Sequence, residues 1–431
     1  MHPWGVNAAA RPVERCAGRA GSPSAKRRQT LDAVSAVRLL AAGFVEIFRS
    51  PGRYTEHLSD APTKPRLLLG PGPSNVHPRV REAMAAPMIG HMDPAFLAVL
   101  DEVQQGLRVL FGTKNAMTLP LSATGSAGME ACFVNLLEPG DEIVVGVAGV
   151  FGGRMCDVAT RLGAKVTAVE TEPGTILDPA RMEEAIDRVR PRVVALVHAE
   201  TSTGVCQPVE AIAKAARSAG AFVVLDCVTS LGGLPLAIDD WGIDAVYSGT
   251  QKCLSCPPGL SPASFSDRCL ARVRDRKTPV QSWYLDLGLL AAYFGDGADG
   301  ARVYHHTAPI SAILGLAEGL RRVFDEGMEA REQRHRNAAA ALVEGVAPLG
   351  FRPLVDAAHR LPMLTTLELP ETLIERGEAS VRSRLLDEYG IEVGGGLGKL
   401  AGRVWRVGLM GENARLTNVE SLLNALRREI A

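Results

Sequence analysis

The sequence lacks an excess of charge of either sign. Its 431 residues include 47 lysines and arginines and 48 aspartates and glutamates, for a formal net charge of −1. Such a balance provides no strong field to attract nucleic acid or an anionic membrane surface. No uninterrupted apolar run approaches the ~20 residues that a membrane-spanning helix needs. These absences favour a small polar metabolite, rather than nucleic acid or a membrane, as the partner.

Cysteine is sparse and irregularly placed. Eight cysteines are scattered through the chain without a secretory signal or a regular disulfide spacing, which indicates a reduced, cytoplasmic protein. Cys253 and Cys256 form a CxxC pair, but the second CxxC or paired histidines of a zinc site are missing, so no metal site is expected. The pair also lacks a thioredoxin-like context, and two small buried thiols are the simpler interpretation.

The first 65 residues differ in composition from the rest of the chain. They are rich in arginine, with alanine, serine and proline and few acidic residues. This composition is found in organelle transit peptides, which would place the protein in an organelle. A disordered leader or a start codon placed too far upstream is the alternative. The apolar residues 37–48 predict one amphipathic helix, too short to span a membrane.

From about Leu67 onward, apolar β-branched runs alternate with segments of helical periodicity. This alternation predicts an α/β fold with a mostly parallel central sheet covered by helices. Strands are expected at residues 142–146, 192–197, 221–226 and 243–247. Helices are expected at residues 124–137 and 209–218, and after the N-cap Asp178.

The composition changes again after about His306, where a smaller α+β domain is expected. Its helices are predicted at residues 314–326, 332–349 and 418–430, and its strands at 361–369 and 402–409. The expected organisation is a leader over residues 1–65, a large domain over 66–306 and a small domain over 307–431.

Polar residues fall where the predicted parallel strands end. Residues 200–203, Asp226 and residues 249–252 occupy such positions. Ligands bind at the carboxyl ends of strands in open α/β sheets, so these residues are expected to converge on one site.

Lys252 and Asp226 are candidate reactive groups of this site. Most lysines are solvated surface charges, but Lys252 follows a buried strand and a Ser-Gly-Thr turn and precedes Pro-Pro-Gly. Desolvation on such a constrained loop would lower its pKa and make the amine a nucleophile for an aldehyde. Asp226 closes an apolar strand, where a carboxylate is costly unless paired. It is either a satisfied structural carboxylate or the anionic partner of a protonated heterocyclic nitrogen.

Three further motifs have a functional and a structural interpretation. Thr124-Gly125-Ser126 begins a helix and offers backbone N–H groups to a phosphate, although many helices begin this way. Residues 394–399 resemble a phosphate loop but fail the Walker spacing, so a glycine turn between strands is expected. Arg406, in the middle of a strand, would bind a carboxylate, either of a substrate or in an internal salt bridge.

With Asp226, Gln251-Lys252, residues 304–307 and Arg406 in this order, the sequence resembles the class V aminotransferases. It is most similar to the alanine–glyoxylate and serine–pyruvate or serine–glyoxylate aminotransferase group of pyridoxal-phosphate enzymes. The resemblance extends from about Leu67 through the last helix. Further matching motifs are residues 69–75, 135–141 and 200–205. The resemblance implies a fold-type-I homodimer with pyridoxal 5'-phosphate as its cofactor.

The resemblance also implies a role for each site residue. Lys252 would be the Schiff-base lysine, and Asp226 would pair with the pyridine nitrogen. Phe151 would stack on the ring, and Thr201 would bond its phenolic oxygen. Arg406 would bind the substrate α-carboxylate. The phosphate would be held by Thr124, Gly125, Ser126 and Gln251, and from the other subunit by Tyr304 and Thr307.

The implied reaction is a ping-pong transfer of an amino group from alanine or serine to glyoxylate or pyruvate, most similar to the alanine–glyoxylate type. The sequence assigns no second cationic residue to a side-chain carboxylate, which favours small neutral donors. The family often has Trp, His and Ser where Phe151, Ser126 and Thr201 stand. Serine–glyoxylate and ureidoglycine–glyoxylate transfer therefore remain alternatives.

Two functions of other classes are also considered. A desulfurase-like lyase would need a mobile C-terminal cysteine, but no cysteine follows Cys269. A non-catalytic cofactor-binding protein would have no need to keep both Lys252 and Arg406.

Overall fold

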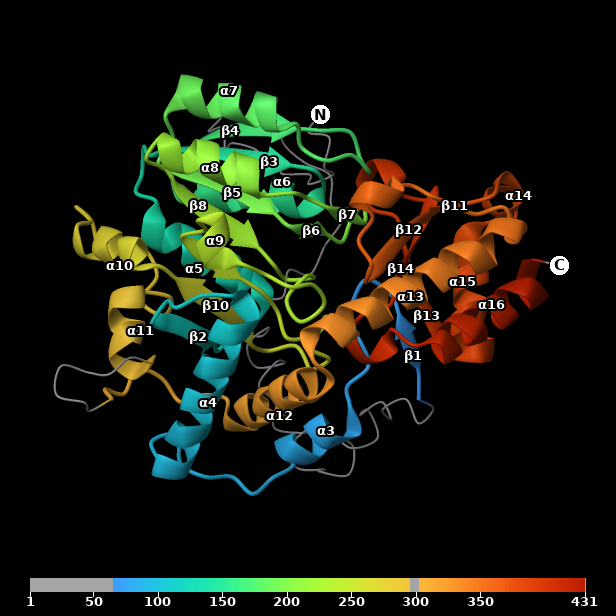
Figure 1. Cartoon of the computed structure of the whole chain (residues 1–431), viewed down its shortest axis with the longest axis horizontal. Coiled ribbons are helices and arrows are strands. Elements are labelled where there is room, and N and C mark those ends of the chain that lie inside the picture. Colours follow the sequence, from blue (N-terminus) through green and yellow to red (C-terminus); the bar gives the residue numbers. More distant parts are fainter. Residues whose placement is uncertain (1–64, 295–301, 431) are drawn as a thin grey trace, which may run out of the picture. The chain divides into compact units, whose positions relative to one another are not determined.

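Seven strands form the larger of two main sheets in the computed structural model, which describes residues 65–294 and 302–430 (Figure 1). Neighbouring strands run parallel from β9 to β4, and β10 is antiparallel to both of its neighbours. The prediction of an α/β fold with a mostly parallel central sheet is confirmed. In order across the sheet, the strands are β2 (Met117–Leu121), β10 (Ser261–Phe265), β9 (Ala245–Tyr247), β8 (Phe222–Asp226), β5 (Val193–Val197), β3 (Glu142–Val147) and β4 (Lys165–Glu170).

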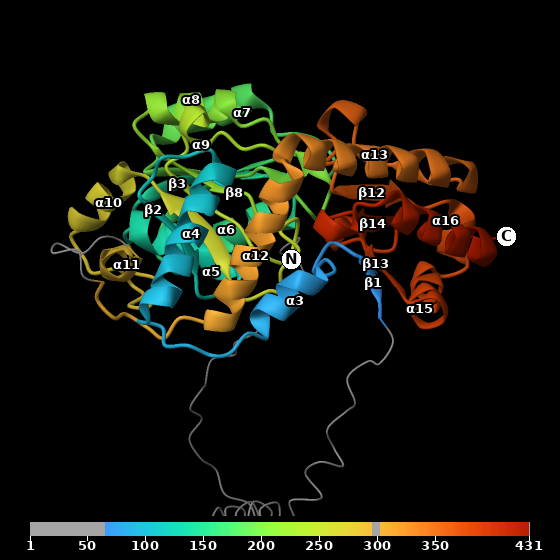
Figure 2. The same ribbon diagram turned by 60° about the horizontal axis from the view of Figure 1, so that its bottom comes forward.

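The central strands are buried along their whole length because helices cover both faces of the sheet. Every residue of β5 and β8 is buried, as expected for a parallel strand enclosed on both sides. In Figures 1 and 2, α7 and α8 lie together beside the parallel strands, while α4 and α11 lie next to β2, at the opposite edge of the sheet from β4. The helices of this part are α3 (Pro78–Met84), α4 (Pro94–Phe111), α5 (Gly125–Leu136), α6 (Val150–Arg161), α7 (Pro179–Val189), α8 (Glu210–Ser218), α9 (Ile238–Trp241), α10 (Asp267–Arg274), α11 (Leu287–Phe294) and α12 (Ile310–Glu326).

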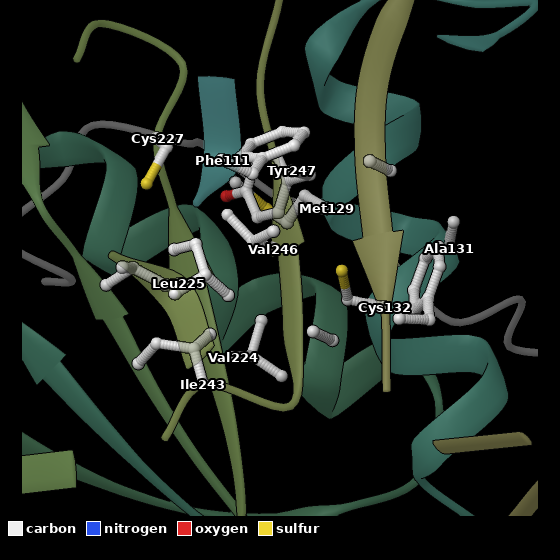
Figure 3. Packing of buried hydrophobic residues seen from close by; sticks show 14 of the residues in the cluster. Phe111, Met129, Ala131, Cys132, Val224, Leu225, Cys227, Ile243, Val246 and Tyr247 are labelled. Atoms are coloured by element: carbon white, nitrogen blue, oxygen red, sulfur yellow. The ribbon is translucent and has the colours of Figure 1, made fainter. Parts of the chain in front are cut away.

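Helix α5 packs directly on the strands that carry the polar residues of the site. Figure 3 shows Met129 and Cys132 of this helix beside Val246 and Tyr247 of β9. Gly128 permits the close approach, since a Cβ at this position would lie 2.9 Å from the Cβ of Tyr247. The start of α5 is thereby held at the carboxyl end of β9.

The second sheet has five strands, and its first strand comes from the start of the described chain. Strand β1 pairs in parallel with β13, while the other neighbours are antiparallel. Across the sheet the strands are β1 (Leu67–Leu69), β13 (Ile391–Gly395), β14 (Val404–Gly408), β12 (Leu364–Glu368) and β11 (Arg352–Pro353). The helices of this part are α13 (Met328–Val346), α14 (Glu371–Glu375), α15 (Glu378–Tyr389) and α16 (Leu416–Ile430). A two-stranded sheet pairs β6 (Ala199–Glu200) with β7 (Val205–Cys206).

Each sheet has its own apolar core. Helix α12 contributes Ile313 and Leu316 to the core of the larger sheet, although it follows the expected boundary at residue 306. Leu69 of β1 belongs to the core of the smaller sheet. The division into domains at residues 66–306 and 307–431 stays a prediction. The expected leader over residues 1–65, with its helix at 37–48, lies outside the described residues.

Within residues 65–294 and 302–430, no helix is long and apolar enough to cross a membrane. In the same ranges, His, Cys, Asp and Glu side chains form no group of three that could hold a metal ion.

Candidate active site

A cavity of about 220 Å³ lies where β5, β6 and β8 end and α5 and α6 begin. The structure brings together in its lining eight of the residues to which the sequence assigned a role. They are Thr124, Gly125, Ser126, Phe151, Thr201, Asp226, Gln251 and Lys252.

Asp226 is the last residue of β8, and its carboxylate is held by two hydrogen bonds. The hydroxyl of Tyr247 donates to Oδ2 at 2.7 Å, and the backbone N–H of Val228 donates to Oδ1 at 2.8 Å. Its side chain is only 3 % exposed, and burial raises its pKa to about 6. The carboxylate thus lines the cavity, desolvated but hydrogen-bonded. This setting favours its pairing with a cationic group.

Lys252 enters the cavity from a loop that Ser74 anchors through two hydrogen bonds. The backbone N–H of Ser74 donates to the Gln251 carbonyl at 2.8 Å, and the Ser74 hydroxyl donates to the Lys252 carbonyl at 2.7 Å. Its ammonium donates to the Pro71 carbonyl. A Cβ on Gly72, whose φ is +106°, would lie 2.6 Å from the Lys252 Nζ, so only glycine leaves room for the lysine. Burial lowers the pKa of Lys252 to about 8, which leaves part of the amine neutral near neutral pH.

The start of α5 offers hydrogen-bond donors to an anion. Thr124 is its N-cap but makes no side-chain capping bond. The Ala127 N–H donates to the Thr124 carbonyl at 2.9 Å, whereas the N–H groups of Gly125 and Ser126 have no intrahelical acceptor. The nearby Gln251 Oε1 is buried and has no hydrogen-bond partner among the described residues. Rotation of this amide by a half-turn would place its Nε2 donor where Oε1 now lies, and Gln251 could then donate to an anion. The hydroxyls of Thr124 and Ser126 are exposed beside these amides.

Phe151 and Thr201 both line the cavity. Phe151 lies in the first turn of α6 and is half-buried, while Thr201 is buried directly after β6. The guanidinium of Arg154 lies over the Phe151 ring, 4.8 Å from its centroid. Arg154 is exposed and lines the same cavity. A second cation therefore borders the site, which the sequence alone did not assign.

Arg406 lies in the middle of β14 and does not bind an internal carboxylate. Its Nε donates to the Gly395 carbonyl at 2.8 Å, and its Nη1 donates to the Thr201 carbonyl at 3.2 Å. Of the alternatives left by the sequence, the internal salt bridge is wrong, because no carboxylate of the described residues lies within ion-pair distance of it. Burial lowers the pKa of its guanidinium, and the neighbouring charge of Glu200 opposes that shift. The charge of Arg406 is thus neutralised only in part.

Tyr304 and Thr307 do not line this cavity in the described part of the chain. Tyr304 is 57 % exposed, and its hydroxyl lies 3.4 Å from the Thr307 Oγ1. Their side chains are available to another molecule rather than to the cavity of their own chain.

Cys253 and Cys256 are two separate buried thiols. The Cys253 Sγ donates to the Thr229 carbonyl at 3.3 Å, and the Cys256 Sγ donates to the Leu254 carbonyl at 3.4 Å. Burial raises their pKa values to about 11 and about 12. Thiols of this kind are poor nucleophiles, since the thiolate is the reactive form.

Tyr247 and Arg154 line the cavity, although sequence reasoning gave them no role. Glu200 and Ser202 were expected near the site only as part of residues 200–203. The alignment of β8 with β9 places Tyr247 opposite Asp226. A signal for Tyr247 was available, because it ends the strand expected next to that of Asp226. A signal for Arg154 was also available, because a residue three positions after Phe151 lies on the same face of a helix. The contacts of Glu200 and Ser202 with the start of α6 span about 50 residues and gave no local signal.

Known proteins are similar to this chain in sequence and in fold. The family model described as "Aminotransferase class-V" matches residues 75–404. The alanine–glyoxylate aminotransferase of Oryctolagus cuniculus is 42% identical over 85% of this chain and 93% of its own. The (S)-ureidoglycine–glyoxylate transaminase of Bacillus subtilis is 38% identical over 84% and 89%, respectively. The crystal structure of an alanine–glyoxylate aminotransferase from Nostoc sp. superposes with a TM-score of 0.83 at 45% identity, over 87% of this chain and 98% of that one. The predicted fold and enzyme class are confirmed, and the chain belongs to the class V aminotransferase family.

Proposed function

We propose that the cavity binds pyridoxal 5'-phosphate and that the protein transfers an amino group from a small amino acid to glyoxylate. The observation that carries this proposal is the presence of Lys252 and Asp226 in one cavity, with lowered and raised pKa values respectively. A desolvated amine and a buried carboxylate are the two groups that a pyridoxal-dependent transfer needs from the protein.

The residues present fit this cofactor. The free N–H groups at the start of α5 and the amide of Gln251 would hold the phosphate. The ring would lie against Phe151, with Thr201 near its phenolic oxygen and Asp226 at its nitrogen. When bound, pyridoxal phosphate supplies an aldehyde and an electron-withdrawing ring that stabilises negative charge at the substrate α-carbon.

Each side chain then has a separate task. The amine of Lys252 would hold the cofactor through its aldehyde, and the neutral amine would take the proton of the substrate α-carbon and return it. The Asp226 carboxylate would keep a proton at the pyridine nitrogen of the cofactor, and the Tyr247 hydroxyl orients that carboxylate. Arg406 binds the substrate carboxylate and so positions the α-carbon within reach of the lysine.

The relatives support glyoxylate as the acceptor. The rabbit and Nostoc relatives are named for alanine and glyoxylate, and the Bacillus subtilis relative for ureidoglycine and glyoxylate. Glyoxylate is common to these names, while the donor differs. We infer alanine, with serine as a second small donor, for this chain. Ureidoglycine is the alternative that the Bacillus relative favours.

We also infer that two copies of the chain complete each site. Tyr304 and Thr307 are exposed and do not line the described cavity of their own chain. In a homodimer they would supply hydroxyl donors to the phosphate of the partner.

The absorbance of the purified protein tests the function directly. With pyridoxal phosphate bound, addition of alanine in the absence of a keto acid is expected to bleach the visible band, and glyoxylate should restore it. Serine, glutamate and ureidoglycine are compared in the same way. The same comparison in Arg154→Ala shows whether the positive charge of Arg154 influences the choice of donor. A protein that stays colourless after incubation with the cofactor would remove the proposal. Fastest bleaching by glutamate would overturn the inferred donor.

Replacing Arg406 with lysine is expected to raise the KM for alanine about 10- to 100-fold, with a smaller change in kcat. The planar guanidinium binds a carboxylate through two parallel bonds, which a lysine ammonium cannot reproduce. A hydrogen bond to a charged group is worth about 1.5–3 kcal/mol, which corresponds to this range. Steady-state kinetics measure the effect. Arg403→Lys, an exposed arginine of the same segment, is the matched control. Equal KM values for both variants would contradict the role of Arg406.

A further inference from the structure

Glu200 is a buried carboxylate that the proposed reaction does not use. It ends β6, and only 1 % of its surface is exposed. Its Oε1 accepts hydrogen bonds from the Ser202 N–H at 3.0 Å and from the Ser202 hydroxyl at 2.6 Å. Its Oε2 accepts a hydrogen bond from the Phe151 N–H at 3.2 Å. Both oxygens are thus occupied by donors of the chain itself.

These bonds replace the missing cap of α6. The N-cap residue of this helix is Gly149, which has no side chain to accept from the first turn. The Ser202 hydroxyl accepts from the Val150 N–H at 2.9 Å, and Glu200 accepts from the next N–H. Gly149 also leaves the space, since a Cβ there would lie 2.6 Å from the Glu200 Cδ. The first turn of α6 therefore depends on a loop about 50 residues further along the chain.

The same carboxylate lies one residue before a contact with Arg406, whose Nη1 donates to the Thr201 carbonyl at 3.2 Å. The charge of Glu200 acts to raise the pKa of Asp226 and that of Arg406. Burial raises its own pKa, and the hydrogen bonds from Ser202 and from the start of α6 oppose this. The positive end of the helix dipole adds to that opposition. An ionised Glu200 offsets part of the charge with which Arg406 attracts a carboxylate.

We propose that Glu200 is a positioning residue: it holds the first turn of α6 and hence the Phe151 ring at the cavity wall, and it moderates the charge of Arg406. The first part needs no cofactor. The second part rests on the proposed function, because it concerns the carboxylate of the substrate.

Amide hydrogen exchange of the full chain, without added cofactor, tests the first part. In Glu200→Gln the side-chain amide has one acceptor and one donor end, so it cannot accept from both Phe151 and Ser202. Exchange at residues 150–152 is expected to be about tenfold faster, while α16 is unchanged. Asp157→Asn removes an exposed carboxylate from the same helix and should leave these amides as in the wild type. Wild-type exchange at residues 150–152 in Glu200→Gln would overturn the proposal.

Competition by acetate against the amino donor in the cofactor-loaded enzyme tests the second part. Glu200→Gln should bind acetate about three- to tenfold more tightly, because Arg406 has lost a negative neighbour, and kcat should fall as the Phe151 ring loses its position. Equal or weaker acetate binding would overturn the moderating role.

Ser202→Ala distinguishes the holding of α6 from the moderation of the Arg406 charge, and it replaces Glu200→Gln in these tests if that variant does not fold. It removes the acceptor of the Val150 N–H but keeps the charge of Glu200. Faster exchange at Val150 with unchanged acetate binding supports the proposal, and unchanged exchange contradicts it. If the protein proves not to transfer amino groups, the exchange result still decides the role of Glu200 in α6.

Discussion

Replacing Lys252 with alanine is expected to lower the rate of amino-group transfer by at least ~10³-fold. General acid–base catalysis by a positioned side chain contributes up to about 10⁴-fold, and the same amine also attaches the cofactor. Among the described residues that line the cavity, Lys252 is the only lysine, so no neighbouring amine stands ready to replace it. Single-turnover rates with alanine, measured at saturating cofactor, determine the loss.

The control for this variant is Lys399→Ala. Lys399 is an exposed lysine in the glycine-rich segment that failed the Walker spacing, and its loss should leave the rate unchanged. Borohydride reduction of the cofactor-loaded wild type fixes the cofactor covalently to the lysine that holds it. Peptide mapping should then find this pyridoxyl label on Lys252. Retention of more than a tenth of wild-type activity in Lys252→Ala would contradict the assignment, as would a label on another lysine.

The lowered pKa of Lys252 determines how attachment depends on pH. An ammonium group cannot attack an aldehyde, so the rate follows the neutral fraction of the amine. With a pKa lowered from 10.5 to about 8 by burial, the rate of cofactor attachment should rise through pH 8 and level off above it. Below pH 8 it should fall about tenfold per pH unit. A midpoint near the ordinary lysine value would show that the amine is solvated before the cofactor arrives.

The sequence predicted those elements whose signals are local. Asp178 followed by Pro179 predicted the start of α7, and the Asp178 side chain accepts from the Ala180 N–H at 2.9 Å. The apolar runs predicted β5 and β8 within one residue of their ends. Because parallel strands end at one edge of a sheet, the convergence of Asp226 and Lys252 could be predicted as well.

Contacts between distant segments could not be predicted in this way. The cap of α6 by Glu200 joins segments about 50 residues apart, and no spacing rule relates them. The same holds for β1, whose parallel pairing with β13 brings the first described residues to the smaller sheet. The partners of Arg406 are backbone carbonyls, which side-chain types do not reveal. Periodicity indicates which residues face inward, but only the tertiary arrangement determines what they meet.

Replacing Asp226 with asparagine is expected to lower the transfer rate by about 10²- to 10³-fold. Asparagine has the same shape but carries no charge, so the pyridine nitrogen would lose the anion that keeps it protonated. Removing one partner of a buried ion pair costs about 3–5 kcal/mol, or about 10²- to 10⁴-fold, and the expected loss falls in the lower part of that range. The loss should appear in kcat more than in KM, because the carboxylate does not contact the substrate carboxylate that Arg406 binds. Steady-state kinetics with alanine and glyoxylate measure both constants.

A matched control distinguishes this chemical role from the general cost of changing a buried carboxylate. Asp244 is 1 % exposed at the start of β9 and accepts bonds from Arg268 at 2.9 Å and from the Val223 N–H at 3.0 Å. Asp244→Asn should lower the free energy of unfolding but leave kcat per folded molecule close to that of the wild type. Asp226→Asn should instead lower kcat strongly and change the free energy of unfolding little. The reason is that the Asp226 carboxylate is desolvated in the absence of a cation, and its pKa is already raised to about 6. A kcat for Asp226→Asn within about fivefold of the wild type would mean that Asp226 is a structural carboxylate, and the proton at the pyridine nitrogen would need another partner.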